Sequence, residues 1–301
     1  MNDLITKIKE LKNSMDAVIL AHNYQVSEVQ LIADYLGDSL ELSKIAAKIK
    51  NRIIVFAGVK FMAETAKILS PDKTVLLPRL DAGCPMADMI TLDELRELKA
   101  NHPNAFVVTY VNSTAEIKAE SDICCTSANA VNIVKSIEAK EIIFVPDRNL
   151  GSYIQSLVPK KKIILFEGYC YVHNRIKAEE IVLTKEKYPE ANIMVHPEAP
   201  MEVIKTADEV LSTSGMLKFA KESDSKTFIV ATEQGLLERM GRENPDKEFL
   251  PALKPKICSN MKRTSLEDVY DALNEKKYEI IISPEISKRA VSALNKMITY
   301  L

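Results

Sequence analysis

Three cysteines recur at nearly equal intervals along the chain. Cys84, Cys170 and Cys258 are separated by 86 and 88 residues (170 − 84 and 258 − 170), and each follows a short apolar run. Thiols at equivalent places in three copies of one unit can share a metal centre, which a single buried cysteine would not indicate. Three sulfur ligands without a fourth counterpart suit an iron-sulfur cluster with one open iron, or a zinc ion with an open position.

Two further sets of polar residues repeat with the same period. Rings that can form hydrogen bonds end three apolar runs, at intervals of 88 and 86 residues: His22, Tyr110 and His196. Serines recur at intervals of 88 and 87 residues where helices are expected to begin: Ser39, Ser127 and Ser214. Histidine and tyrosine suit proton transfer, and helix N-termini bind anions. Helix capping alone would also explain the serines, and a core position would explain any one histidine.

Several single residues lie near these sets. His173 lies three residues after the second cysteine and Glu198 two residues after the third ring, so both are candidates for general acid-base chemistry. A solvated loop carboxylate is the alternative for Glu198. His102 follows a polar helix and precedes a proline, which indicates a surface residue. Cys124 and Cys125 are adjacent, have no counterparts in the other copies and are expected to pack inside a strand.

The elements that must position these residues alternate between strand and helix. One set of strand-like runs recurs at 88 and 86 residues: Ile53–Ala57, Glu141–Val145 and Thr227–Ala231. Such alternation predicts parallel sheets that are covered on both faces. We therefore expect an α/β protein of three homologous three-layer α/β/α units around a pseudo-threefold axis. Because ligands bind beyond the carboxyl ends of parallel strands, the active site is expected at the centre.

The period also sets the expected unit boundaries. The predicted ranges are 1–82 for unit one with the tail 277–301 packing on it, 83–168 for unit two, and 169–276 for unit three. Within unit one, helical spacing of apolar residues predicts a helix over 29–36, which Gly37 is expected to end.

The composition excludes several classes of protein. The 301 residues carry a net charge of −2 with mixed signs, 47% hydrophobic and 27% charged residues, which predicts a globular protein without nucleic-acid or membrane partners. The N-terminal segment has amphipathic spacing rather than the continuous apolar core of a signal peptide, so a cytoplasmic location is expected. The odd number of five cysteines argues against a disulfide framework. Walker, dinucleotide-binding and His-Glu-x-x-His motifs are absent from the sequence.

Ten short motifs, in order along nearly the whole chain, resemble those of the quinolinate synthase family, the A protein of de novo NAD biosynthesis. They are His22-Asn23-Tyr24-Gln25, Gly37-Asp38-Ser39, Phe61-Met62-Ala63-Glu64, Cys84-Pro85-Met86-Ala87, Tyr110-Val111-Asn112-Ser113-Thr114, Thr126-Ser127-Ala128-Asn129-Ala130, Pro146-Asp147-Arg148-Asn149-Leu150, Cys170-Tyr171-Val172-His173, His196-Pro197-Glu198 and Cys258-Ser259-Asn260-Met261-Lys262.

The resemblance implies a reaction and a cofactor. The expected reaction condenses iminoaspartate (iminosuccinate) with dihydroxyacetone phosphate to quinolinate, releasing phosphate and water, as a transferase and dehydratase in one enzyme. The expected cofactor is one 4Fe-4S cluster per chain, held by Cys84, Cys170 and Cys258, whose open iron acts as a Lewis acid. An aspartate oxidase or dehydrogenase would supply the iminoaspartate.

The resemblance also implies roles for individual residues. The expected catalytic residues are His22, Tyr24, Tyr110, His173, His196 and Glu198. The expected substrate-binding residues are His22, Ser39, Tyr110, Val111, Asn112, Ser127, His196, Pro197, Glu198 and Thr213. The chain departs from the family pattern at Ser214, where many relatives have glycine, and it lacks the Cys-x-x-Cys pair that longer members have near the C-terminus.

Two other classes of protein share part of this pattern. An iron-sulfur hydro-lyase would use the open iron on a single hydroxy acid, without a triose phosphate. A non-catalytic redox or iron-sensing protein would hold the cluster but would not depend on the histidines and tyrosines. Fold alone cannot separate these classes, because three-layer α/β units host many chemistries.

Overall fold

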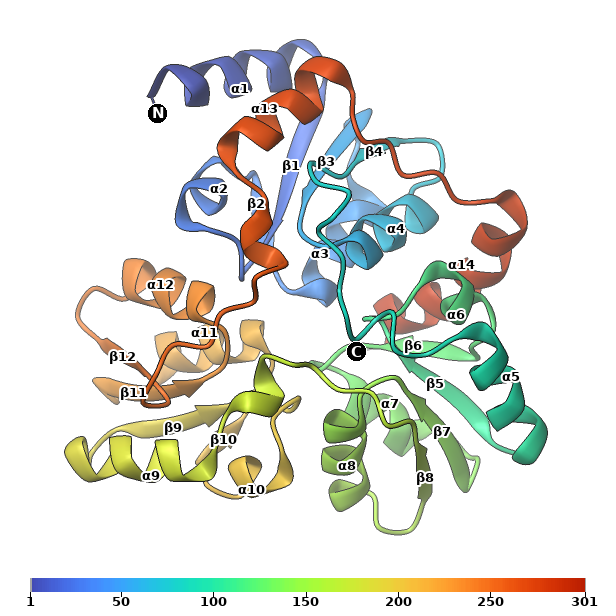
Figure 1. Ribbon diagram of the computed structural model, residues 1–301, viewed down its shortest axis with the longest axis vertical. Helices are drawn as coiled ribbons and strands as arrows, with labels where there is room; N and C mark the ends of the chain where they lie inside the picture. Colours follow the sequence, from blue (N-terminus) through green and yellow to red (C-terminus); the bar gives the residue numbers. More distant parts are fainter. Residues whose placement is uncertain (1, 301) are drawn as a thin grey trace.

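The computed structural model describes residues 2–300 as three α/β units arranged around a common centre (Figure 1). Each unit has one four-stranded sheet, and the strand orders are β2-β1-β3-β4, β6-β5-β7-β8 and β10-β9-β11-β12. All strand pairs within the three sheets are parallel. The predicted fold class of three homologous α/β/α units is confirmed.

The three units contain corresponding elements in the same order. Unit one comprises α1 (Asn2–Ser14), β1 (Ala17–His22), α2 (Ser27–Ile32), β2 (Tyr35–Gly37), α3 (Ser39–Lys48), β3 (Ile53–Ala57), α4 (Lys60–Leu69) and β4 (Thr74–Leu76). Unit two comprises α5 (Leu92–Asn101), β5 (Phe106–Tyr110), α6 (Ala115–Ala119), β6 (Ile123–Cys125), α7 (Ala130–Ser136), β7 (Glu141–Val145), α8 (Arg148–Leu157) and β8 (Lys162–Leu165). Unit three comprises η1 (His173–Arg175), α9 (Ala178–Lys187), β9 (Asn192–Val195), α10 (Met201–Ile204), β10 (Glu209–Val210), α11 (Thr213–Glu222), β11 (Thr227–Ala231), α12 (Gln234–Glu243) and β12 (Glu248–Pro251). The remaining elements are η2 (Met261–Arg263), α13 (Leu266–Glu275) and α14 (Pro284–Thr299).

The strand sequences explain why each sheet is covered on both faces. Successive side chains of a strand point to opposite faces, yet every residue of β1 is buried. Val18 and Leu20 belong to one hydrophobic cluster, whereas Ile19 and Ala21 belong to another on the opposite face. Full burial of a large aliphatic side chain contributes about 1.5–3 kcal/mol, so both faces favour a covering layer of helices. Among residues 2–300, no helix is both long enough and apolar enough to span a bilayer.

The chain after unit three returns to the first two units. Helix α13 packs against α1, and its Val269 and Leu273 are part of the outer hydrophobic cluster of unit one. Helix α13, which lies within the range 169–276 predicted for unit three, thus covers unit one. Residues 278–280 pair with β4 of unit one, whereas α14 contacts α6 and β6 of unit two more extensively than α4 of unit one.

The predicted helix over 29–36 is wrong in its second half. Helix α2 ends at Ile32, and Tyr35–Gly37 form the edge strand β2, paired with β1. The carboxylate of Asp34 accepts the backbone N–H of Ile19 at 2.8 Å and so joins the turn to the central strand. Asp122 and Asp208 make the same 2.8 Å bond in the other units. The recurrence of these aspartates at 88 and 86 residues was a signal for a strand here, and it outweighs the helical spacing.

Candidate active site

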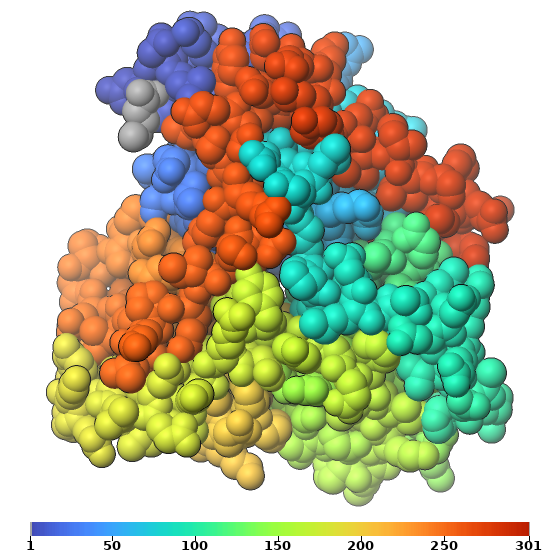
Figure 2. All heavy atoms as spheres, in the orientation of Figure 1, coloured from blue at the N-terminus to red at the C-terminus, as the bar shows by residue number. Residues whose placement is uncertain are grey.

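A central cavity lies where the carboxyl ends of β1, β5 and β9 meet. The loops after β4, β8 and β12 converge on the middle of the face in Figure 1, and their atoms meet over the centre in Figure 2. The cavity encloses about 760 Å³ of space between atoms, its mouth included, and Cys84, Cys170 and Cys258 all line it. Three thiols from three different loops are thus brought to one cavity.

The three cavity thiols are free and partly buried. Burial raises the pKa of the Cys84 thiol to about 12, and it raises the pKa values of Cys170 and Cys258 as well. A bound metal centre would reverse this preference, since its positive charge favours the thiolate form. Soft sulfur donors suit iron-sulfur, zinc or copper sites rather than magnesium or calcium. The donor set therefore fits a cluster held by three cysteines.

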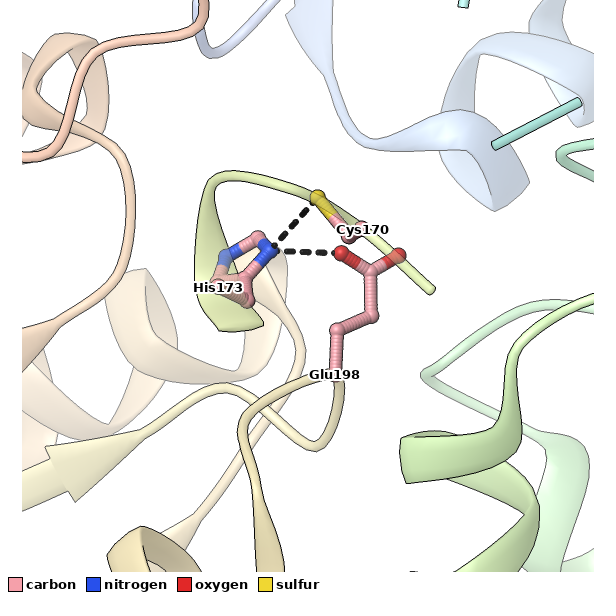
Figure 3. A group of neighbouring side chains, drawn as sticks. All are labelled: Cys170, His173 and Glu198. Carbon is pink, nitrogen blue, oxygen red and sulfur yellow. Dashed lines mark hydrogen bonds and ion pairs between the residues drawn. The ribbon is translucent and has the colours of Figure 1, made fainter. Parts of the chain in front are cut away.

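Glu198 lies at the centre of the polar groups in the cavity and is not a solvated loop residue, since it is only 4% exposed. Its Oε2 lies 2.6 Å from Nδ1 of His173 (Figure 3). Its Oε1 accepts the hydroxyl of Tyr110 at 2.5 Å. Burial opposes the charge of Glu198, but His173 and the other donors outweigh it and lower its pKa to about 2. Because a carboxylate only accepts, the short contact places the His173 proton on Nδ1.

Figure 3 also shows Cys170 beside this pair. Nδ1 of His173 lies 3.3 Å from Sγ of Cys170, and potential ligand atoms of Cys170, His173 and Glu198 all lie within 4.8 Å of one another. A single zinc ion could accept such a Cys-His-Glu set. However, Glu198 and His173 already bond each other, and Glu198 also accepts the Tyr110 hydroxyl. Both residues are therefore less available as metal ligands than the three thiols.

The other two cavity histidines are neutral rings. Burial lowers the pKa of His22 to about 3 and that of His196 to about 3. Nδ1 of His22 accepts the N–H of Tyr24 at 3.1 Å, and Nδ1 of His196 accepts the N–H of Glu198 at 3.4 Å. Each ring therefore carries its proton on Nε2, where it can donate to a ligand. The rings of His196 and His173 stack with centroids 4.5 Å apart.

Thr232 connects two candidate catalytic residues and was not predicted from the sequence. Its hydroxyl lies 2.7 Å from the hydroxyl of Tyr24 and 2.9 Å from Nε2 of His173. Thr232 directly follows β11, so its position at the carboxyl end of a parallel strand was the available signal. It has no polar counterpart at the same position in the other units, and for this reason the repeat did not reveal it.

The hydroxyl groups of Ser39, Ser127 and Thr213 do not cap the helices beside which they lie. Asp38, not Ser39, caps α3, and its carboxylate accepts the N–H groups of Leu40 and Glu41. Ser212, not Thr213, caps α11. Ser39, Ser127 and Thr213 instead line the cavity. Ser214 bonds Glu41 of unit one at 2.6 Å, so its extra hydroxyl contacts the neighbouring unit and is not among the lining groups.

The comparisons with known proteins agree with this geometry. The sequence profile of the family described as "Quinolinate synthetase A protein" matches residues 6–299. The chain belongs to the quinolinate synthase family. A protein of Geobacter sp. (strain M21) named quinolinate synthase is 55% identical over 295 residues, which cover 98% of this chain and 97% of the relative. Proteins of the same name from Thermodesulfovibrio yellowstonii and Alkaliphilus metalliredigens are 52% and 51% identical over 301 and 296 residues, covering 100% and 98% of this chain and 99% and 98% of the relatives.

In this member of the quinolinate synthase family, most residues predicted for the site share the cavity. Those that line it are His22, Tyr24, Ser39, Cys84, Tyr110, Asn112, Ser127, Cys170, His173, His196, Glu198, Thr213 and Cys258. Val111 and Pro197 are buried beside the cavity and are not among its lining residues. Cys124 and Cys125 are fully buried in β6, and half-buried His102 ends α5.

Several residues that line the cavity were not predicted from the sequence. They include Asp38, Val59, Phe61, Met86, Thr126 and Asn260. Most of them belong to the motifs quoted for the resemblance, but apolar or capping residue types gave no reason to assign them a role. Their position became evident only once the three units were assembled.

Proposed function

We propose that the chain is a quinolinate synthase that condenses iminoaspartate with dihydroxyacetone phosphate to quinolinate, releasing phosphate and water, in NAD biosynthesis. The observation that carries this proposal is the convergence of three cysteines and a buried chain of proton-transfer groups on one cavity. The curated relatives of about 50% identity bear the same name, which supports the same activity. Supply of iminoaspartate by an aspartate oxidase or dehydrogenase is part of the proposal.

The cofactor in this proposal is a 4Fe-4S cluster held by Cys84, Cys170 and Cys258. These are the only cysteines among the residues that line the cavity, so a fourth iron would have no thiol ligand. When bound, such a cluster supplies a Lewis acid at its open iron. Zinc is the second candidate, favoured by the close grouping of Cys170, His173 and Glu198.

Substrate anions would be bound without a lysine or arginine side chain, because none is found among the lining residues that the structure describes. Neutral His22 and His196 present Nε2–H groups that can donate to carboxylates. The hydroxyls of Ser39 and Thr213 lie in the first turns of α3 and α11, where the positive end of each helix dipole favours anions. The proposed binding set keeps Tyr110, Val111, Asn112, Ser127, Pro197 and Glu198 beside these four residues.

Protons for isomerisation, imine formation and dehydration would move along a continuous chain of hydrogen bonds. It runs from the Tyr110 hydroxyl through Glu198 to Nδ1 of His173, then from Nε2 through Thr232 to the Tyr24 hydroxyl. Burial, followed by the charge of Glu198, raises the pKa values of both tyrosines well above 10, so each phenol keeps its proton. With the His173 proton on Nδ1, Thr232 donates to Nε2 and Tyr24 donates to Thr232, while Tyr110 donates to Glu198. Both phenols thus donate into the chain, and each phenol oxygen can accept a substrate proton as its own proton moves inward toward Glu198.

Anaerobic reconstitution tests this proposal. About four irons and four sulfides per chain, with quinolinate formed from freshly generated iminoaspartate and dihydroxyacetone phosphate, is the expected result. Cys170→Ala should lose the cluster and the activity together. A full cluster that dehydrates a single hydroxy acid and makes no quinolinate would identify a hydro-lyase, and a cluster protein indifferent to His196→Ala would identify a sensor. Stoichiometric zinc without sulfide would refute the cluster.

A further inference from the structure

The three loops that carry Cys84, Cys170 and Cys258, called the cysteine loops below, are each hydrogen-bonded to the start of a helix in the same way. The first residue of the helix that follows the third strand donates its backbone N–H to the carbonyl group two residues before the cysteine. The pairs are Lys60 with Ala82 at 2.9 Å, Arg148 with Gly168 at 2.8 Å, and Gln234 with Lys256 at 2.9 Å. The repeat therefore extends from the cysteines to the backbone bonds that support them.

The residue just before each of these helices differs among the units. Asp147 and Glu233 occupy this position in units two and three, and both are fully buried, at 0% exposure. The unit-one counterpart is Val59, at intervals of 88 (147 − 59) and 86 (233 − 147) residues. Two of the three cysteine loops thus adjoin a helix that is preceded by a buried carboxylate. The helix next to the Cys84 loop is preceded by the aliphatic side chain of Val59.

Glu233 bonds directly to a cysteine loop. Its Oε1 accepts the backbone N–H of Cys258 at 3.1 Å, and its Oε2 accepts the N–H of Gly235 at 2.6 Å. Lys262, which follows Cys258 on the same loop, lies 3.2 Å from Oε1 and donates to the carbonyl of Tyr24 at 2.6 Å. Glu233 therefore joins the Cys258 loop, the start of α12 and the backbone of a candidate catalytic residue.

Asp147 makes the corresponding contact more loosely. Its Oδ1 accepts the N–H groups of Asn149 and Leu150 at 2.8 and 2.9 Å, and so caps α8. The backbone N–H of Cys170 also faces this carboxylate and opposes the rise in its pKa that burial causes, but Oδ2 has no hydrogen-bond partner among the described residues. An unpartnered buried oxygen costs free energy, so a small movement of the Cys170 amide onto Oδ2 would be favourable.

We propose that Glu233 and Asp147 are positioning residues, which hold the Cys258 and Cys170 loops in the geometry that binds the metal centre. Each carboxylate caps a helix with one oxygen; the other oxygen of Glu233 bonds the Cys258 amide, and the unpartnered Oδ2 of Asp147 is available to the Cys170 amide that faces it. Each thiol would thus be held next to a rigid helix start. In the Cys84 loop Val59 takes the place of the carboxylate, and the loop is held by its backbone bond to Lys60 and by bonds from Arg263 to Asp81. This inference rests on the proposed metal centre but not on the reaction.

Serine variants separate the helix-capping role of each carboxylate from its contact with the cysteine amide. Glu233→Ser and Asp147→Ser retain a helix-capping hydroxyl but are too short to reach the cysteine amide. Asp268→Ser is the control, because the Asp268 carboxylate also stabilises a helix start, where it accepts the N–H of the α13 N-cap Ser265 at 2.9 Å. Its contact with a cysteine loop is an ion pair with Arg79 at 3.6 Å and involves no cysteine amide. All three variants are expected to fold, with similar small decreases in Tm.

The decisive measurement is the rate of iron loss from the reconstituted proteins to a chelator, with the electron paramagnetic resonance spectrum of the reduced cluster. We expect Glu233→Ser and Asp147→Ser to lose iron at least tenfold faster than the wild type and Asp268→Ser, with altered spectra. Glu233→Gln, which keeps an oxygen for the Cys258 amide, should recover much of the difference. Rates within twofold of the control and unchanged spectra would overturn the inference.

Failure of the proposed cofactor can be distinguished from failure of this inference. If the wild type takes up zinc and no sulfide, the cluster is refuted, and the same variants are compared by zinc release to a chromogenic chelator. A wild type that holds neither metal refutes both proposals. If a serine variant does not fold, Glu233→Asp and Asp147→Asn keep a better cap while altering the reach or the charge, and they are measured in the same way.

Discussion

The carboxylate of Glu120, which pairs with the C-terminal helix α14, should make part of the free energy of unfolding depend on pH. Glu120, which ends α6, is 12% exposed at its side chain and lies within 2.7 Å of Arg289 on α14, 3.1 Å of Arg96 and 3.2 Å of Lys99. Burial opposes its charge, but hydrogen bonds from these three cations outweigh that effect and lower its pKa from 4.5 to about 2. We therefore predict that Glu120→Gln destabilises the protein at neutral pH.

The size of this effect follows from the pKa and from the exposure of the cations. A pKa lower by about 2.5 corresponds to about 3.4 kcal/mol of folding free energy. The cation side chains are 37% to 54% exposed, so solvent screening reduces the expected loss to about 1–2 kcal/mol. Because the folded pKa is depressed, this stabilisation is complete above the unfolded pKa of about 4.5 and is lost as the pH falls toward about 2.

Urea unfolding at two pH values measures the prediction. The difference in unfolding free energy between the wild type and Glu120→Gln should be about two fifths smaller at pH 3.5 than at pH 7, since the unfolded carboxyl is then about ten-to-one protonated. Added salt should also reduce it at pH 7. Glu186→Gln, an exposed glutamate of α9, serves as the control and should change stability little. Equal losses at both pH values would show that Glu120 acts through packing and would refute the electrostatic reasoning.

Three further predictions concern single side chains. Thr232→Val breaks the hydrogen-bond chain between His173 and Tyr24 and leaves both buried partners unpaired. It should lower kcat by about 5- to 150-fold without changing the cluster content. An unchanged kcat would show that Thr232 takes no part in proton transfer. Lys118→Met leaves the buried carbonyl of Ser113 without its hydrogen-bond donor and should lower the free energy of unfolding in urea by about 1–3 kcal/mol. An unchanged unfolding midpoint would show that this hydrogen bond does not stabilise the protein. Ser214→Gly removes the exposed bond to Glu41 and a contact with the Asp38 carboxylate, which keeps its bonds to the N–H groups of α3. Substrate KM should therefore stay within about twofold, and a larger change would place this hydroxyl in the binding site.

The sequence alone predicted the features that depend on local pattern and on repetition. Alternating apolar strands and helices indicated three parallel sheets, and the near-constant period identified Cys84, Cys170 and Cys258 as equivalent. Parallel strands place their carboxyl ends at one edge of a sheet. The alternation of strand and helix, together with the repeat, was therefore enough to assign the residues that follow these strands to a common cavity.

The tertiary structure decided what depends on contacts between distant segments. Whether Glu198 is solvated or paired depends on Tyr110 and His173, which reach it from elsewhere in the chain. The same holds for Thr232, which has no polar counterpart in the other units. Helix α13 has an apolar stripe that fits any suitable layer, and only assembly shows that it packs on α1. Local pattern specifies which face of an element is buried, but its partner is chosen by packing across the whole molecule.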